Sequence, residues 1–285
     1  MLVDLHLHSR ASDGTMTPGE IAREGARRGF GMLALADHNT DKGWGPFAAA
    51  CRKAGVIPLR GMELDCLYDR WDIHLLAYGY IPTRTLTDLA AHSLGRMLDM
   101  SDDLVRRLLP AFSQLSWEEW SAYEADPAQG GWKGLQYLRD KGVIGRLEDG
   151  MGLYKEQGCD YRDYSFPAME EACRVVRASG GVPVLAHPAN WFASLSQPEL
   201  YRHLDAMAEL GLGGIECHYP SHTPEMTWMC RCYCRRHGWL MTAGSDWHGE
   251  FNKVAHGVTY ELGRVRVDLG ELDLGNLLEA GGTKG

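Results

Sequence analysis

Long hydrophobic runs are missing from this chain of 285 residues. No apolar stretch approaches the roughly 20 residues that a membrane-spanning helix needs, so a helical membrane protein is not expected. A recognisable signal peptide is missing too, because Met1-Leu2-Val3-Asp4 already enters an expected strand. Internal repeats and low-complexity segments are also absent. We therefore expect a cytoplasmic protein without a membrane partner.

Positive charge is scarce, since 29 lysines and arginines stand against 38 aspartates and glutamates, a net charge of −9. This deficit argues against binding of extended nucleic acid through a general basic surface. It does not argue against a small anionic substrate, because bound metal ions can supply the local positive potential that the side chains lack. The composition leaves the oligomeric state open.

A disulfide framework is not expected, although the chain has eight cysteines. In a chain of this size without a secretory signal, cysteines are better interpreted as reduced thiols. Cys230, Cys232 and Cys234 could suggest a metal site, but Thr223-Pro224-Glu225 predicts a helix start just before them. On a helix Cys232 faces away from the other two, so we interpret all three as buried or half-buried thiols.

What the chain does have is an alternation of strand and helix signals, with 45% hydrophobic residues. Thr17-Pro18-Gly19-Glu20 combines a capping residue, a proline at the first helical position and a glutamate three residues after the cap. Gly29 is placed to end that helix. Apolar runs alternate with further helical stretches, as in parallel βα units, near residues 56–59, 73–78, 182–186, 213–217 and 239–243. One large α/β domain with an elaboration is predicted.

The alternation breaks between about residues 94 and 164. This segment has a charged amphipathic stretch, a tryptophan pair and a glycine-containing loop. We predict that residues 94–164 form a helical insertion, or lid, over the mouth of a barrel that is built from residues 1–93 and 165–270. A merely stabilising appendage is the alternative. Residues 271–285 are predicted to be a frayed C-terminal tail.

Nine side chains that bind hard or borderline metal ions follow one another along the chain, mostly at expected strand ends: His6, His8, Asp13, His38, Glu63, His74, His187, Asp246 and His248. In Leu5-His6-Leu7-His8, alternation places both imidazoles on one side of a strand and both leucines on the other. Ligands at the ends of many separate strands are how a barrel builds one site at its mouth. His74, with apolar neighbours, would by itself be a hydrogen-bonded core histidine, but its place in the ordered set favours a ligand.

Six imidazoles and three carboxylates exceed the about four protein ligands that one ion needs, so two or three ions are predicted. Mixed nitrogen and oxygen ligands suit manganese, iron or zinc better than magnesium. This pattern is typical of a metallohydrolase.

The ligand motifs resemble those of the PHP (polymerase and histidinol phosphatase) family, and more closely its stand-alone bacterial metal-dependent phosphoesterase branch. The motifs are DLHLHSRASDGT at 4–15, ADHNT at 36–40, GME at 61–63, LAHP at 185–188 and GSDWHG at 244–249. The resemblance implies an α/β fold, a distorted (β/α)7 TIM-like barrel, with a trinuclear metal centre.

The resemblance also implies which residues hold each ion. The first ion would be held by His6, His8, Glu63 and Asp246. The second would be held by Glu63, His74 and His187, with Glu63 bridging, and the third by Asp13, His38 and His248. Among these ligands we take Glu63, Asp246 and His187 as the expected catalytic residues.

Hydrolysis of a phosphate ester is the chemistry that such a centre would serve. Clustered cations neutralise phosphoryl oxygens and lower the pKa of a bound water from 15.7 towards about 7, so a metal-bridging hydroxide could attack phosphorus in line. We expect a phosphoesterase that acts on phosphate monoesters or cyclic diesters of a small metabolite. A nucleoside bisphosphate or a ribosyl cyclic phosphate is the kind of substrate that the resemblance implies.

Two other functions stay open. A non-catalytic or regulatory metal-binding module would show degenerate ligands, and none of the nine is missing. An amidohydrolase acting on C–N bonds would show a metal-bridging lysine at a strand end, and no lysine stands at such a place in these motifs.

Substrate contacts are predicted in two places near the mouth. Arg10 follows the His-x-His strand within reach of a phosphate. Many relatives have a Gly-Arg-x-His element in the insertion that is thought to hold a substrate phosphate, whereas this chain has GGWKGL at 130–135. Lys133 and Trp132 are the candidates there for a phosphate contact and for stacking. His222 is a further candidate.

The other polar residues near these motifs have structural interpretations. Asp4 is expected to orient an imidazole ligand, and Asp37 to act in a similar way. His218 and His222 follow a strand and are not expected to be direct metal ligands. The remaining histidines are expected on the surface or in packing: His92, His203, His237 and His256.

Overall fold

An eight-stranded sheet forms the body of the protein in the computed structural model, which describes residues 1–251, 253–255 and 257–278. The strand order is β10-β1-β2-β3-β4-β5-β6-β7. The bounds are β1 Leu2–Leu7, β2 Phe30–Leu35, β3 Ile57–Tyr68, β4 Trp71–Tyr78, β5 Val182–Leu185, β6 Gly214–His218, β7 Leu240–Ala243 and β10 Val267–Asp268. A separate small hairpin joins β8 (Val254–Ala255) to β9 (Val258–Thr259).

The sheet curls into a nearly closed barrel. The segment after β7 pairs with the end of β1, since Asp246 N donates to His6 O at 2.9 Å and His8 N donates to Trp247 O at 2.9 Å. Seven strands of the wall, β1 to β7, agree with the predicted distorted (β/α)7 barrel, and β10 adds an antiparallel eighth strand beside β1.

Besides β10, the wall strand β4 runs against its neighbours, which corrects the expectation of uniformly parallel βα units. β4 is antiparallel to both β3 and β5. β3 and β4 are joined by only two residues, Asp69 and Arg70, and a parallel connection needs a crossover of a dozen or more. Asp69 has φ 53°, which fits this tight turn. The reversal brings the first half of β4, with His74, to the mouth where the parallel strands end.

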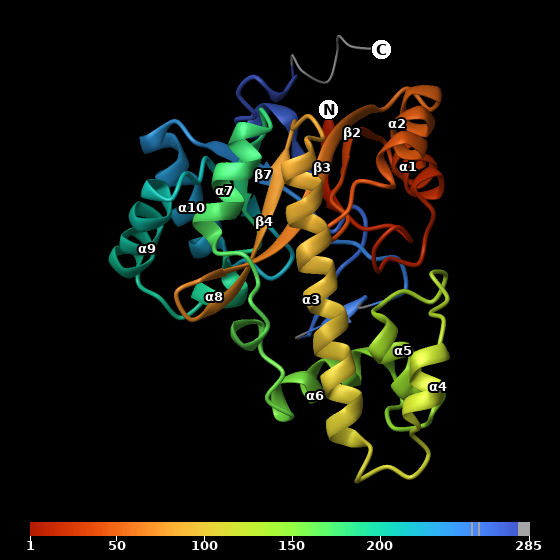
Figure 1. Ribbon diagram of the computed structural model, residues 1–285. Helices are drawn as coiled ribbons and strands as arrows, with labels where there is room; N and C mark the ends of the chain where they lie inside the picture. Colours follow the sequence, from red (N-terminus) through yellow and green to blue (C-terminus); the bar gives the residue numbers. More distant parts are fainter. Residues whose placement is uncertain (252, 256, 279–285) are drawn as a thin grey trace.

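Helices cover the outside of the barrel (Figure 1). α1 (Pro18–Arg27) begins after the N-cap Thr17, with the predicted reciprocal capping bonds to Glu20, and Gly29 follows its end with φ 84°. The predicted helix start is therefore confirmed. The other outer helices are α2 Trp44–Lys53, α7 Met169–Ala178, α8 Ala189–Phe192, α9 Gln197–Glu209 and α10 Pro224–His237.

A β-bulge in β1 corrects the expected alternation of Leu5 and Leu7. Asp4 pairs with Leu33 and Leu7 with Leu35, so three steps along β1 oppose two along β2. Because of the extra residue, the side chains after the bulge point to the opposite face of the sheet from the one that regular alternation would give. Leu5 therefore packs in the barrel-interior cluster, whereas Leu7 packs in the cluster beneath α1 and α2.

A separate hydrophobic cluster lies in the segment predicted to be an insertion. α3 (Arg84–Leu108) joins it to the barrel: Leu86 and Leu89 pack in the barrel's outer core, the cluster between the sheet and helices α7, α9 and α10, whereas Leu104 and Leu108 pack in the cluster of the predicted insertion. Figure 1 shows α3 running from the barrel to the shorter helices. These are α4 Trp117–Ala122, α5 Lys133–Asp140, η1 Leu147–Gly150, α6 Met151–Glu156 and η2 Tyr161–Asp163. The boundaries at 94 and 164 stay a prediction, and the first of them falls inside α3.

The C-terminal segment closes the bottom of the barrel, which corrects the prediction of a frayed tail for its described part. Met241 forms a bridge with Asp273, and η3 spans Leu269–Glu271. Leu274 and Leu277 are buried in the barrel-interior cluster. The end of the predicted tail, residues 279–285, lies outside the described residues.

Two compositional expectations can be compared with the structure. Of the helices in the described part of the chain, none has the length and apolar character to cross a bilayer. All eight cysteines lie among the described residues and are free thiols. On α10, Cys230 and Cys234 are buried and Cys232 is partly exposed, which confirms the predicted helical arrangement.

Candidate metal centre

All nine predicted ligands converge at the mouth of the barrel. His6 and His8 come from the end of β1, His38 follows β2, and His187 follows β5. Asp246 and His248 follow β7. The other three have different positions: Asp13 lies in the loop after β1, Glu63 lies inside the long β3, and His74 lies in the reversed β4.

Glu63 is at the middle of the group and is buried. Its two oxygens face five imidazoles. Oε1 lies 3.0 Å from His74 Nδ1 and from His187 Nε2. Oε2 lies 3.1 to 3.3 Å from the Nε2 atoms of His6, His8 and His38. A carboxylate with neighbours on both oxygens is suited to bridge two ions.

The ligand atoms group in sets that match the three ion sites implied by the sequence. His6, His8, Glu63 and Asp246 form one set, with N···O separations between 3.1 and 3.4 Å. Ligand atoms about 2.1 Å from an ion lie about 3.0 to 3.4 Å apart in octahedral or tetrahedral geometry, so this set fits a transition-metal ion. Glu63, His74 and His187 form a second set.

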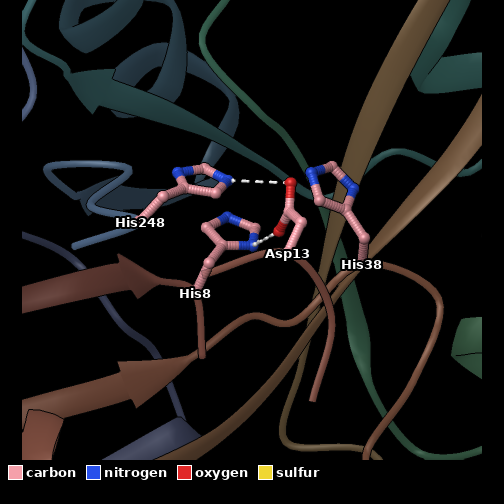
Figure 2. A group of neighbouring side chains, drawn as sticks. All are labelled: His8, Asp13, His38 and His248. Atoms are coloured by element: carbon pink, nitrogen blue, oxygen red, sulfur yellow. Dashed lines mark ion pairs between the residues drawn. The ribbon is translucent and has the colours of Figure 1, made fainter. Parts of the chain in front are cut away.

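The third set contains His8, Asp13, His38 and His248, so His8 joins the three residues that the resemblance implied (Figure 2). The rings of His8 and His248 are stacked with centroids 4.0 Å apart. The Asp13 carboxylate faces both rings, with His248 Nε2 3.4 Å from Oδ2 and His8 Nδ1 3.7 Å from Oδ1. His38 lies on the other side of Asp13 in Figure 2.

A buried nitrogen without a hydrogen bond supports the interpretation as a metal centre. His8 Nε2 forms no hydrogen bond within the described residues, although it lies 3.2 Å from Glu63 Oε2 and 3.1 Å from Asp246 Oδ1. A buried polar atom without a hydrogen-bond partner costs free energy, about 1 to 3 kcal/mol. A metal ion at the set of His6, His8, Glu63 and Asp246 would give this nitrogen a partner, so the residues present fit the group that the sequence predicts.

The buried carboxylates and imidazoles of the centre shift one another's pKa values toward the charged forms. Burial by itself raises the pKa of Glu63, but the facing imidazoles, His6 first, hold it well below its usual value. Burial lowers the pKa of His248, but Asp13 and Asp246 raise it to about 9. Burial also lowers the pKa of His6, but the surrounding carboxylates, Glu63 first, raise this pKa well above its usual value.

Glu216, which the sequence analysis did not single out, orients two of the ligands. Its Oε1 lies 3.0 Å from His6 Nδ1, and its Oε2 accepts a bond from His187 N at 2.8 Å. The sequence gives little signal for this role, because Glu216 lies within β6 rather than at a strand end. Asp4, for which a structural role or the orientation of an imidazole was expected, has a backbone contact instead of a ring contact: its Oδ1 accepts from Ser245 N at 2.9 Å.

Two further polar residues near the ligands were not predicted. The Tyr219 hydroxyl donates to Asp246 Oδ2 at 2.8 Å. Asp65, two residues after Glu63, forms a ligand-like set with His38 and His74. Asp37 contacts the loop after β1, since Ser9 N donates to its Oδ1 at 2.6 Å and Ser12 Oγ donates to the same atom at 2.8 Å.

A cavity of about 830 Å³ opens beside the ligands. Its lining joins residues of the centre to residues of the insertion and of the β3–β4 turn. Aromatic and cationic side chains of this lining are Trp132, Tyr154, Lys155, Tyr161, Arg162, Arg70 and Trp191. Of the four predicted substrate contacts, Trp132 lines this cavity.

The other three predicted substrate contacts have neighbours elsewhere, and their contact with a substrate stays a prediction. Lys133 Nζ lies 4.3 Å from the centroid of the Trp120 ring. Arg10 Nε donates to Thr15 O at 2.7 Å. His222 is held by the backbone, since Ala189 N donates to its Nε2 at 3.4 Å and its Nδ1 donates to Cys217 O at 3.1 Å. Burial lowers the pKa of His222 to about 4, so it is neutral at pH 7.

The remaining described histidines make packing or surface contacts. His92 Nε2 lies 2.9 Å from Ser165 O, His203 stacks on Phe192, and His237 stacks on Tyr233. His218 Nε2 is buried and has no hydrogen-bond partner among the described residues. His256 lies outside the described residues.

Comparison with known proteins gives matches along most of the chain. Residues 4–126 match the model of the PHP domain. A phosphoribosyl 1,2-cyclic phosphate 1,2-diphosphodiesterase from Eggerthella lenta is 29% identical, over 90% of this chain and 97% of its own. A 3′,5′-nucleoside bisphosphate phosphatase from Chromobacterium violaceum is 26% identical, over 86% and 87%. A 5′-3′ exoribonuclease from Escherichia coli is 27% identical, over 87% and 85%.

Two solved structures resemble the whole fold. A protein from Bifidobacterium adolescentis, provisionally described as a metal-dependent phosphoesterase, superposes with a TM-score of 0.73 and 28% identity. The match covers 94% of this chain and 98% of that one. A structure described as an amidohydrolase from Chromobacterium violaceum, with bound sulfate and no metal, has a TM-score of 0.70 and 25% identity, over 89% and 90%.

Proposed function

We propose that this chain, which belongs to the PHP domain family, is a metal-dependent phosphoesterase acting on a small phosphorylated metabolite. The observation that carries the proposal is the set of nine imidazoles and carboxylates gathered around Glu63. When bound, the ions would neutralise phosphoryl oxygens and make a water molecule acidic enough to attack at neutral pH. We further propose three ions of manganese, iron or zinc.

The protein's own residues would hold and orient these ions. His6, His8, Glu63 and Asp246 would hold the first, Glu63, His74 and His187 the second, and Asp13, His38 and His248 the third, with the other nitrogen of His8 facing Asp13. Glu216 would fix the His6 ring through its contact with Nδ1, and the Tyr219 hydroxyl would fix the Asp246 carboxylate by donating to Oδ2. We propose Glu63, Asp246 and His187 as catalytic residues, and all three are among the ligands that line the cavity.

The substrate would enter the 830 Å³ cavity, which has room for a nucleotide or a sugar phosphate. Trp132 is positioned there to stack on a ring, and Lys155 and Arg70 offer positive charge away from the ligands. Phosphate monoesters and cyclic diesters are both compatible with this space. We propose a small substrate rather than extended nucleic acid, and a cytoplasmic location that suits eight reduced thiols.

Cleavage of a C–N bond is the second candidate, because one structure with this fold is described as an amidohydrolase. The bridging position here is taken by Glu63, and Lys155, a lysine of the described cavity lining, comes from α6 of the insertion rather than from a barrel strand. Phosphoester hydrolysis is therefore the function that the geometry supports best. A purely regulatory module is less favoured, because the full ligand set is present.

A substrate screen tests this proposal. The manganese-loaded protein would be incubated with nucleotides, sugar phosphates, cyclic phosphates and, as a separate class, N-acyl amino acids. We expect hydrolysis within the phosphoester classes and none after treatment with a chelator. Turnover of the N-acyl class alone would replace the proposal by the amidohydrolase function, and no turnover of any class by a protein with bound ions would favour the regulatory module.

A further inference from the structure

Asp65 lies beside the metal ligands without belonging to the nine. It is on β3 two residues after Glu63, so the two side chains point to the same face of the strand. It is buried, with 2% of its surface exposed. Its Oδ1 lies 3.3 Å from His38 Nδ1 and 3.2 Å from His74 Nε2. One carboxylate oxygen therefore faces two predicted ligand rings.

Both rings turn their other nitrogen to Glu63. His38 Nε2 lies 3.3 Å from Glu63 Oε2, and His74 Nδ1 lies 3.0 Å from Glu63 Oε1. A neutral histidine that binds an ion through one nitrogen carries its proton on the other. In metal sites that proton is usually donated to a carboxylate or a carbonyl, which fixes the ring. Here Asp65 is the carboxylate at the right place for both rings.

We propose that Asp65 is a positioning residue that accepts the N–H groups of His38 and His74 through one oxygen and so sets which nitrogen of each ring faces the ions. The proposal rests on the proposed metal centre. Asp65 would then orient two ligands that belong to different ion sets, His38 and His74.

Other contacts hold Asp65 in this position. The Asn39 side-chain amide donates to Asp65 Oδ2, and Asp65 N donates to Asn39 Oδ1 at 3.2 Å. Ser93 Oγ of α3 donates to the Asp65 carbonyl at 3.3 Å. Oδ2 is thus occupied, while Oδ1 forms no hydrogen bond within the described residues and faces the two ring nitrogens at 3.3 and 3.2 Å. The free oxygen is the one aimed at the histidines.

Asp65 also lies where the insertion meets the barrel. Tyr161 of η2 stands close enough that, after burial, the charge of Asp65 is the main cause that raises the pKa of this phenol. The Tyr161 ring is itself fixed by stacking on Phe166, with centroids 4.0 Å apart.

The competing role for Asp65 is that of a direct ligand. Its oxygen and one nitrogen of each ring lie within 4.8 Å of one another, as an ion would require. An ion there would make each ring bridge two ions, because the opposite nitrogens face Glu63. That arrangement needs both rings to lose both protons, so the positioning role is favoured.

Metal titration of variants separates the roles. Affinity for Zn²⁺ would be measured by competition with a chromophoric chelator, and stoichiometry by elemental analysis at saturating metal. Co²⁺ absorption in the visible range would report the ligand geometry. We expect Asp65→Ala to weaken metal affinity about 10- to 100-fold with unchanged stoichiometry and an altered Co²⁺ spectrum. Asp65→Asn keeps an acceptor oxygen and should lose less.

A matched control lies on the same hairpin. Asp72 pairs across the strands with Leu67 and lines the cavity, and within the described residues it forms no ion pair with an imidazole. Asp72→Asn removes the same charge and should leave the metal affinity and the spectrum unchanged. If Asp65→Ala fails to fold, as shown by circular dichroism, Asp65→Asn against Asp72→Asn gives the same comparison.

The outcomes are distinct. A wild-type protein that binds no metal would overturn the proposed function itself. A wild-type protein that binds metal while Asp65→Ala binds it equally well would overturn only the positioning role. Loss of one whole ion from Asp65→Ala at saturation would also overturn that role, since it would make Asp65 a direct ligand.

Discussion

At the scale of single residues, the centre depends on carboxylates that each serve several imidazoles. Glu63 faces five rings with two oxygens, and Asp246 is contacted by His6, His8 and the Tyr219 hydroxyl. Such shared positions are sensitive, because a change at one residue alters every pair it makes. Peripheral ligands such as Asp13 have fewer partners and should tolerate substitution better.

Glu63→Gln tests the bridging role. Glutamine keeps the size of the side chain but has one oxygen donor in place of two and no charge. We expect the variant to fold, to lose at least one bound ion and to retain less than about 1% of the wild-type kcat. Elemental analysis and phosphate release are the measurements. Glu250→Gln, at an 80% exposed side chain, is the matched control, and near-normal turnover by Glu63→Gln would place the bridge at another residue.

Lys155→Ala tests whether this lysine of the cavity lining contacts the substrate. Removing one charge-assisted contact costs about 1.5 to 3 kcal/mol, so we expect kcat/KM to fall about 10- to 150-fold for a substrate with a second phosphate. Hydrolysis of a simple aryl phosphate should change little, because it lacks the remote group. Lys133→Ala, whose ammonium lies over Trp120, is the control. Equal losses on both substrates would assign Lys155 to the fold instead.

At the scale of elements, strand direction and strand irregularity place the ligands. The reversal of β4 brings His74 to the mouth from the N-terminal half of its strand, and the bulge in β1 directs Leu5 and Leu7 to different clusters. On α10, helical spacing separates the buried Cys230 and Cys234 from the partly exposed Cys232.

Thiol reactivity tests this arrangement of α10. Burial raises the pKa of the Cys51 and Cys173 thiols to about 12, and it also raises the pKa of Cys230, so few thiolates form at these sites at pH 8. We expect a disulfide reagent such as DTNB to modify one thiol per native chain rapidly and all eight after denaturation. Cys232→Ser should remove the fast phase. Several fast thiols in the native wild type would contradict the burial described here.

Sequence patterns predicted the part of the site that consists of polar residues at strand ends and in the adjacent turn. His6, His8, His38, His187 and Asp246 stand out because each interrupts or ends an apolar run. Glu216 and Asp65 do not stand out, because they are acidic residues inside strands and their partners lie far away in the sequence. The direction of β4 could not be predicted either, because the apolar pattern of a strand is the same in parallel and antiparallel pairing.

At the scale of the whole molecule, the barrel mouth concentrates ionisable groups whose protonation couples to stability. In the metal-free protein the pKa of His248 is raised to about 9 from the usual 6.5, and those of His6, His38 and His74 are raised as well. The stabilisation from these protonated rings is fully present below pH 6.5 and is lost as the pH rises through the folded values.

Opposite pH trends are therefore expected for the two forms. The melting temperature of the metal-free protein should fall between pH 6.5 and 9. Ions need deprotonated rings, so the gain from manganese should grow over the same interval. A free ion concentration of 100 Kd adds about 2.7 kcal/mol per site, enough to raise Tm by about 5 °C or more. Calorimetry with and without a chelator is the measurement, and a metal-dependent gain that shrinks with rising pH would contradict this account.

The helix α3 has a consequence for how this architecture can change over generations. Its 25 residues span about 37 Å, and its first half packs in the barrel's outer core while its second half packs among the helices of the insertion. The predicted insertion, residues 94–164, therefore does not begin at a structural boundary, because residue 94 lies inside this helix. A chimaera with its junction at residue 94 would divide α3 and would leave the apolar side chains of one half without their packing partners. Any viable exchange between relatives should carry the whole helix, from Arg84, together with the barrel surface on which its first turns rest.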